Sequence, residues 1–84
     1  MHAIEFVPSA ARELANLDQA MKRRLARRID QLAAEPRGAG LLKLRGADDV
    51  WRARVGDYRI IYQIEDDRLL VLVVKIGHRR DVYR

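Results

Sequence analysis

The chain has 84 residues, enough for one compact domain but too few for a second hydrophobic core, so we expect a single domain spanning residues 1–84. Hydrophobic residues make up 49% of the sequence and charged residues 35%, which is typical of a folded domain and not of a disordered segment. The sequence has no cysteine and only two histidines, His2 and His78, so we expect neither a metal nor a cofactor. The net charge of +5 favours a polyanionic partner, because lysine and arginine neutralise phosphates.

The N-terminal segment and the longest apolar run both argue against export and membrane insertion. Residues 1–8 alternate apolar and polar side chains, whereas a secretory signal has a basic region followed by a long apolar one. The apolar run at residues 69–74 is far shorter than the roughly 20 residues that cross a bilayer. We therefore expect a cytoplasmic protein with no membrane partner.

The first half of the chain predicts a strand followed by a helical hairpin. Ile4 and Phe6 alternate with polar neighbours, as in a strand, and Pro8 then opens a short helix. Asp18 is expected to be the N-cap of a longer helix. Residues 35–40 interrupt the helical pattern after it. The longer helix carries an apolar stripe of Met21, Leu25, Ile29 and Leu32, with arginines largely around the other side, namely Arg23, Arg24, Arg27 and Arg28.

The second half of the chain predicts strands, because the hydrophobic period changes from near 3.6 residues to two. Residues 51–55 alternate apolar and polar, and Gly56-Asp57 forms a favoured two-residue hairpin loop before a β-forming run at residues 58–64. A second turn at residues 66–67 leads into residues 68–76, whose continuous apolar stretch predicts burial on both faces.

These elements together predict an α+β fold. An N-terminal strand and a helical hairpin precede an antiparallel β-meander, which forms one small sheet. The helices are expected to cover one face of that sheet and to leave the other partly open.

The hairpin register predicts a cluster of arginines. If Gly56 and Asp57 form the loop, Arg54 lies directly opposite Arg59, and Arg52 follows on the same face. Like charges placed opposite each other destabilise a strand pair by a few tenths to about 1 kcal/mol, so the cluster predicts an anion-binding site. The alternatives are an ordinary solvated strand face, or a structural cluster neutralised by nearby aspartates, namely Asp48, Asp49 and Asp57.

Two further residues and the helical arginines have alternative interpretations. His78 is either a loop histidine or a proton-transfer group, because histidine is the side chain type that exchanges protons near neutral pH. Tyr83 either caps the core, or stacks on a base and exchanges a proton with a ribose hydroxyl. The helical arginines form either a solvated face or a surface that docks onto ribosomal RNA.

Four short segments form an ordered set that extends over the second half of the chain. They are KLRG at residues 43–46, VWRAR at 50–54, YRIIY at 58–62 and GHRRDVY at 77–83. Together with the early helical hairpin that ends at Pro36, this set resembles the RelE branch of the RelE/ParE toxin superfamily. The resemblance covers nearly the whole chain, and the ordered set is more specific than any one segment.

The resemblance implies a toxin of a type II toxin–antitoxin system. Such a toxin is a ribosome-dependent endoribonuclease that cleaves messenger RNA and so inhibits translation. Its implied partners are a cognate antitoxin protein that wraps around it and blocks it, messenger RNA in the ribosomal A site, and the 16S ribosomal RNA.

Carried over residue by residue, the active face of that family falls on Arg52, Arg54, Arg59, Arg79 and Tyr83. The ribose 2′-hydroxyl attacks the adjacent phosphate without a metal. Arg59 and Arg79 are expected to stabilise the charge on the phosphorane, where one preorganised donor contributes about 3–4 kcal/mol. Outside this face, the residues expected to bind RNA are Arg23, Arg24, Arg27, Arg28, Lys43, Arg45 and Arg80.

This sequence departs from the family pattern because the positions of Arg52 and Arg54 are often lysine. Lysine accepts a proton after losing its own, whereas arginine stays charged and cannot serve as a general base. The two arginines are therefore expected to bind phosphate, and the base is assigned to either Tyr83 or His78.

A second interpretation is a ParE-like toxin, which shares the fold but inhibits DNA gyrase without enzymatic activity. Both subfamilies can have Tyr-Arg in the central hairpin and a basic turn near the end of the domain. The combination of the hairpin arginines with Arg79 and Tyr83 favours the ribonuclease, because a gyrase inhibitor does not need all of them together.

Overall fold

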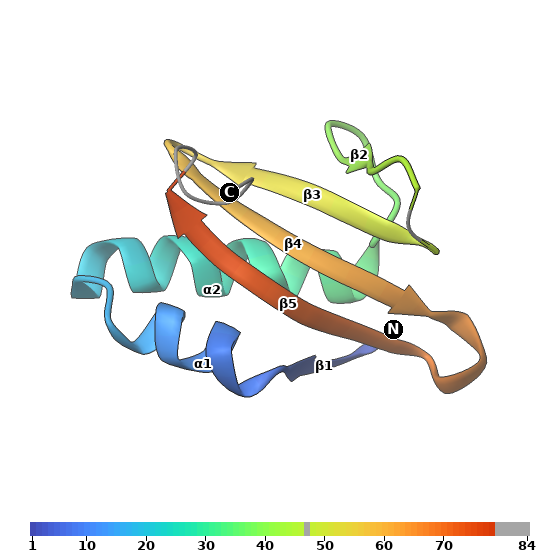
Figure 1. Ribbon diagram of the computed structural model, residues 1–84, viewed down its shortest axis with the longest axis horizontal. Coiled ribbons are helices and arrows are strands. Elements are labelled where there is room, and N and C mark those ends of the chain that lie inside the picture. The colour runs from blue at the N-terminus through green and yellow to red at the C-terminus, as the bar shows by residue number, and fades with distance from the viewer. Residues whose placement is uncertain (47, 79–84) are drawn as a thin grey trace.

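Two helices pack on one side of a five-stranded sheet (Figure 1). The computed structural model describes residues 1–46 and 48–78. In chain order, its elements are β1 (Ala3–Phe6), α1 (Pro8–Ala15), α2 (Gln19–Ala34), β2 (Leu42–Lys43), β3 (Val50–Val55), β4 (Tyr58–Glu65), a 3-10 turn (Asp66–Arg68) and β5 (Leu70–His78). The predicted α+β fold, with helices covering one face of the sheet, is confirmed.

The strand order is β1-β5-β4-β3-β2, and β1–β5 is the only parallel pair of the described sheet. The predicted meander corresponds to β3, β4 and β5, which pair antiparallel. Strand β5 therefore has a neighbour on each side, which accounts for its apolar sequence. Burial on both faces is confirmed for Leu70 and Val71, whereas Leu72 and Val74 are only half-buried.

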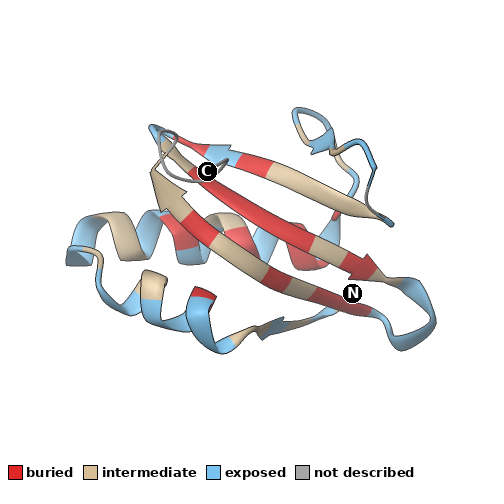
Figure 2. Ribbon diagram, viewed as in Figure 1, coloured by how far each residue is buried: buried red, intermediate tan, exposed pale blue. Residues whose placement is uncertain are grey.

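The core lies between the helices and the sheet, and the buried residues of β4 and β5 run along its length (Figure 2). The predicted N-cap of α2 is confirmed, because Asp18 Oδ1 accepts a hydrogen bond of 2.8 Å from the backbone N–H of Met21. Leu25, Ile29 and Leu32 on the apolar stripe of α2 are buried. Within the described residues, neither helix has the length and hydrophobicity needed to cross a membrane.

Arg37 connects three loops at the end of the sheet that is remote from the β3–β4 turn. Its guanidinium donates to Asp49 and forms two hydrogen bonds to Asp66, of 3.1 and 2.8 Å. Asp49 also accepts a hydrogen bond of 2.9 Å from the indole N–H of Trp51. Hydrogen bonding from Arg37 holds the pKa of the exposed Asp66 carboxyl below its usual range. The carboxylate of Asp49 thus accepts hydrogen bonds from both Arg37 and Trp51.

Tyr62 fixes the loop after α2 to the centre of the sheet. Its side chain is fully buried, and its hydroxyl donates a hydrogen bond of 2.7 Å to the backbone carbonyl of Pro36. Burial raises the pKa of this phenol to about 12. The folded protein therefore favours the protonated tyrosine.

We expect Tyr62→Phe to lower the free energy of unfolding by about 1–2 kcal/mol near neutral pH, because it leaves the carbonyl of Pro36 without its donor. Above pH 10 the unfolded wild-type tyrosine loses its proton while the folded one keeps it, so the unfolded state binds fewer protons. The stability of the wild type should therefore fall as pH rises from about 10 to 12, and Tyr62→Phe should lack this contribution. Urea unfolding of both proteins at several pH values measures the difference, and parallel pH dependences would contradict the assignment.

Candidate functional site

The turn between β3 and β4 sets the register of the candidate site. Gly56 has a positive φ of 59°, whereas Asp57 does not, which is the pattern of a type II′ hairpin turn. The turn aligns Val55 with Tyr58 and Arg54 with Arg59. The predicted register of this hairpin is therefore confirmed.

Arg59 is a buried cation on the face of the sheet opposite the helices. Only 7% of its surface is exposed, and its neighbours across the strands are Arg54 on β3 and Gly77 on β5. Its Nη1 donates a hydrogen bond of 3.3 Å to the carbonyl of Tyr58, whereas its Nε has no partner in the described part of the chain. A guanidinium has five N–H donors, and burying one with so few partners is unfavourable. The neighbour of Arg59 on β5 is Gly77, which has no side chain.

The other two hairpin arginines lie on the same face as Arg59. Arg54 is exposed, and Arg52 is half-buried beside Ile61 of β4. Within residues 1–46 and 48–78, no ion pair is formed by Arg54 or Arg59. The alternative in which Asp49 neutralises the cluster is not supported, because this carboxylate binds Arg37 and Trp51.

His78 lies on the other face of β5. It pairs with Tyr58, and the two rings contact each other edge to face, with centroids 5.8 Å apart and an interplanar angle of 81°. Tyr58 packs against the core on the helix side, whereas the next residue, Arg59, points to the opposite side. The structure therefore does not bring His78 together with the arginines. The other expected residues of this end of the chain, Arg79, Arg80 and Tyr83, lie outside the described residues.

The expected RNA-binding residues fall into two separate places. Lys43 and Arg45 are exposed and line a hollow of about 470 Å³ in the loop that follows β2. Arg24, Arg27 and Arg28 line a hollow between α2 and the β3–β4 turn, which Arg54 also borders. Arg23 is exposed and lies on the same helix, but it does not border that hollow.

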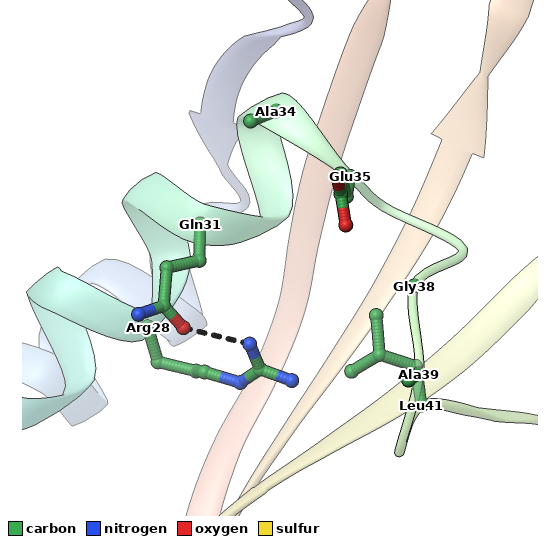
Figure 3. Close-up of a pocket in the computed structure, with 7 residues that line it drawn as sticks. All are labelled: Arg28, Gln31, Ala34, Glu35, Gly38, Ala39 and Leu41. Carbon is green, nitrogen blue, oxygen red and sulfur yellow. Dashed lines mark hydrogen bonds between the residues drawn. The ribbon is translucent and has the colours of Figure 1, made fainter.

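A further hollow of about 330 Å³ lies where the end of α2 meets residues 38–41 (Figure 3). Arg28 and Gln31 project into it and are joined by a hydrogen bond of 2.7 Å, and Glu35 lies on the same rim. This hollow contains both charges and was not expected from the sequence, because it depends on how the loop folds back onto the helix.

Gly77 and Glu13 were also not identified as site residues from the sequence. A glycine inside a strand pattern is a signal for close approach of a ligand or backbone, and this signal was present at Gly77. Glu13 Oε1 accepts a hydrogen bond of 3.0 Å from the backbone N–H of Ile76, beyond the last residues that pair with β1. Its Oε2 accepts one of 2.5 Å from Lys75. The edge of β5 is thus closed by α1, and no local pattern in the sequence signals this contact.

Known proteins match this chain over nearly its whole length. The family model described as "ParE toxin of type II toxin-antitoxin system, parDE" matches residues 4–83. Toxin RelG of Mycobacterium tuberculosis is 31% identical over 87 aligned residues, which cover 99% of this chain and 97% of that protein. The mRNA interferase toxin RelE of Escherichia coli K12 is 27% identical over 78 residues, which cover 90% of this chain and 81% of that protein.

The fold is also similar to that of a solved toxin in complex with its antitoxin. The crystal structure of the intact E. coli RelBE toxin-antitoxin complex contains a chain that matches with a TM-score of 0.85 and 25% sequence identity. The match covers 93% of this chain and 96% of that chain.

Proposed function

Since the chain belongs to the RelE/ParE superfamily of toxins, we propose that it is a metal-independent endoribonuclease that cleaves messenger RNA on the ribosome. The chain is a RelE-like toxin of a toxin–antitoxin system. The mRNA interferase activity is that of the E. coli relative, and we extend it to this chain as a proposal.

The observation that carries the proposal is the burial of Arg59 beside Arg54 without an acidic partner in the described residues. A buried guanidinium whose Nε lacks a hydrogen-bond partner is costly to the folded protein. An incoming phosphate supplies both the missing charge and the missing acceptors. An arginine held in place before the reaction stabilises the charge that develops in the transition state without further reorganisation.

In the proposed mechanism, the ribose 2′-hydroxyl attacks the adjacent phosphorus, and the bond from phosphorus to the 5′-oxygen of the next nucleotide breaks. The 5′-oxygen leaves with the electron pair of that bond and takes up a proton from water. Arg59 and Arg79 bind the non-bridging oxygens, whose negative charge grows in the phosphorane. Arg52 and Arg54 hold the phosphate in position. In this proposal Tyr83 is the general base and, as the phenolate, takes the proton from the 2′-hydroxyl. The product is a cyclic phosphate, and the proposed chemistry needs no metal.

We propose three partners for this activity. The first is an antitoxin protein, because the E. coli fold relative forms a toxin–antitoxin complex. The others are messenger RNA in the ribosomal A site and the 16S ribosomal RNA, for which the net charge of +5 is favourable. Cytoplasmic location follows from these partners as part of the same proposal.

The second candidate function is non-enzymatic inhibition of DNA gyrase, which the ParE description of the matching family model favours. The two candidates differ in what they require of Arg59. An inhibitor that binds a protein surface does not require a buried cation that lacks an acidic partner. A ribonuclease requires one at the reacting phosphate.

Brief induction of the protein in cells, followed by primer-extension mapping of message ends and a gel of plasmid supercoiling, tests the proposal. New ends inside the codons of translated messages, with unchanged supercoiling, are the expected result. Intact messages together with altered supercoiling would replace the ribonuclease with the gyrase inhibitor.

A further inference from the structure

A basic hollow of about 290 Å³ lies between α2 and the β3–β4 turn. Its lining includes Arg24, Arg27 and Arg28 from α2 and Arg54 from β3, together with Gln31 and Gly56. No acidic residue lines it, in contrast to the hollow of Figure 3, where Glu35 is present.

The arginines of this hollow have few partners within the described part of the chain. Arg24, Arg27 and Arg54 form no ion pair and no side-chain hydrogen bond there, and Arg28 donates only to the neutral Gln31. Four guanidinium groups around one hollow repel each other. A bound anion removes that repulsion, and phosphate matches the planar fork of arginine better than a single-point acceptor does.

Arg24 lies close to the backbone of the β3–β4 turn. The Arg24 guanidinium lies 3.5 Å from where a Cβ on Gly56 would be. Gly56 also has a positive φ of 59°, which a residue with a side chain adopts only with strain. Glycine at this position is therefore required by the turn, and the Arg24 guanidinium lies within van der Waals distance of that Cβ position.

The hollow continues from the Arg54–Arg59 pair around the edge of the sheet. Strand β2 pairs with Trp51 and Arg52, so among the described residues β3 has a free edge at residues 53–55. Arg54 lies on that free edge, where it borders the hollow and is also paired with Arg59. Arg59, Arg54 and the arginines of α2 therefore form a continuous series of positive charges, from the buried Arg59 to the exposed face of α2.

We propose that this hollow binds backbone phosphates of the RNA strand whose reacting phosphate lies at Arg59, on nucleotides that flank the cleaved bond. The inference rests on the proposed function, since it takes RNA as the substrate. A strand with one phosphate per nucleotide matches a series of arginines, whereas a single acidic side chain of a protein partner matches only one of them.

Fluorescence anisotropy with a fluorescein-labelled, unstructured RNA decamer tests the inference. The decamer is 2′-O-methylated at every ribose, so it lacks the attacking hydroxyl and binding is measured without cleavage. We expect Arg24→Ala and Arg27→Ala each to weaken binding by about fivefold. Each should also reduce the magnitude of the slope of the logarithm of the association constant against log [salt] by about 0.7. Arg12→Ala removes the same charge from the exposed surface of α1 and should leave both quantities unchanged.

Three outcomes would overturn the inference. Equal losses in Arg12→Ala and Arg24→Ala would mean that only overall charge matters. A loss confined to a hairpin RNA would assign the hollow to structured ribosomal RNA and not to the substrate strand. A loss confined to a labelled decaglutamate peptide would assign it to an acidic protein partner.

Circular dichroism checks that each variant is folded. If Arg24→Ala does not fold, the test uses Arg27→Ala, because Arg27 is exposed. Cleavage of messages in cells is scored separately for the same variants. A wild type that binds the decamer but cuts no message would refute the ribonuclease and not the hollow. A wild type that cuts messages while all variants bind the decamer equally well would refute the hollow alone.

Discussion

Arg59→Ala is expected to reduce the rate of RNA cleavage by about 10²–10³-fold, which corresponds to about 3–4 kcal/mol of transition-state stabilisation. The reason is the geometry of the site. Arg59 is 7% exposed, its Nε has no partner among the described residues, and its neighbours across the sheet are Arg54 and the side-chain-free Gly77. A guanidinium in this position has most of its donors available for a phosphate. Single-turnover cleavage of a message in a translating extract measures the rate.

The matched control is Arg68→Ala, which removes the same charge from an exposed arginine on the 3-10 turn, paired with Glu65. It should keep nearly full activity. Arg59→Lys keeps the charge but loses the two-pronged donor, so an intermediate rate is expected. Full activity of Arg59→Ala would refute the proposed active face.

The stability of an Arg59→Met variant separates a functional role from a structural one. If Arg59 were there to hold the sheet together, Met should destabilise the protein. If Arg59 is retained for a phosphate, Met of similar length removes a poorly partnered buried charge, and the melting temperature should stay the same or rise while cleavage is lost. A fall in both activity and stability would support the structural role.

The parts of the fold that follow local rules could be predicted from the sequence. The N-cap at Asp18 needs only a side-chain acceptor near the first turn of a helix, and it forms the expected bond to Met21. The hairpin at Gly56 needs only a two-residue loop, and it aligns Arg54 with Arg59 as expected. Local sequence rules, each acting over a few residues, were therefore enough to predict the Arg54–Arg59 pair at the centre of the candidate site.

The parts that depend on distant contacts could not be predicted. Strand β2 has two residues, too short for any periodic pattern. The parallel pairing of β1 with β5 joins segments more than sixty residues apart, and nothing in either strand specifies the partner. The burial of Arg59 was not predictable either, because it depends on how neighbouring strands pack around the hairpin.

The face on which His78 lies is the clearest example, because a single extra residue decides it. The pairing of β4 with β5 shifts at Ile61/Tyr62, so that Val74 has no partner on β4. Uninterrupted alternation from the buried Val73 would place His78 on the face of Arg59. The bulge reverses the alternation, and His78 instead lies with Tyr58 on the helix side. No sequence pattern marked this bulge.

The same bulge bears on His78 as a candidate for the general base. We expect His78→Gln to leave the cleavage rate nearly unchanged, because the ring packs against Tyr58 on the opposite face from Arg59. Its cost should be a small loss of stability, about 0.5–1.5 kcal/mol for the lost aromatic contact. A lower melting temperature with normal cleavage is therefore the expected result.

Tyr83→Phe should instead reduce the cleavage rate by about 10²–10⁴-fold, the usual contribution of a general base. The substitution keeps the ring and removes only the hydroxyl, so RNA binding through stacking should be retained, and anisotropy with the 2′-O-methylated decamer checks this. Loss of binding in parallel with cleavage would mean that Tyr83 holds the RNA and does not move the proton. If Tyr83→Phe cleaves at the wild-type rate while His78→Gln does not, the base is His78, and the end of β5 must then rearrange around the bulge to bring the imidazole to the face of the arginines.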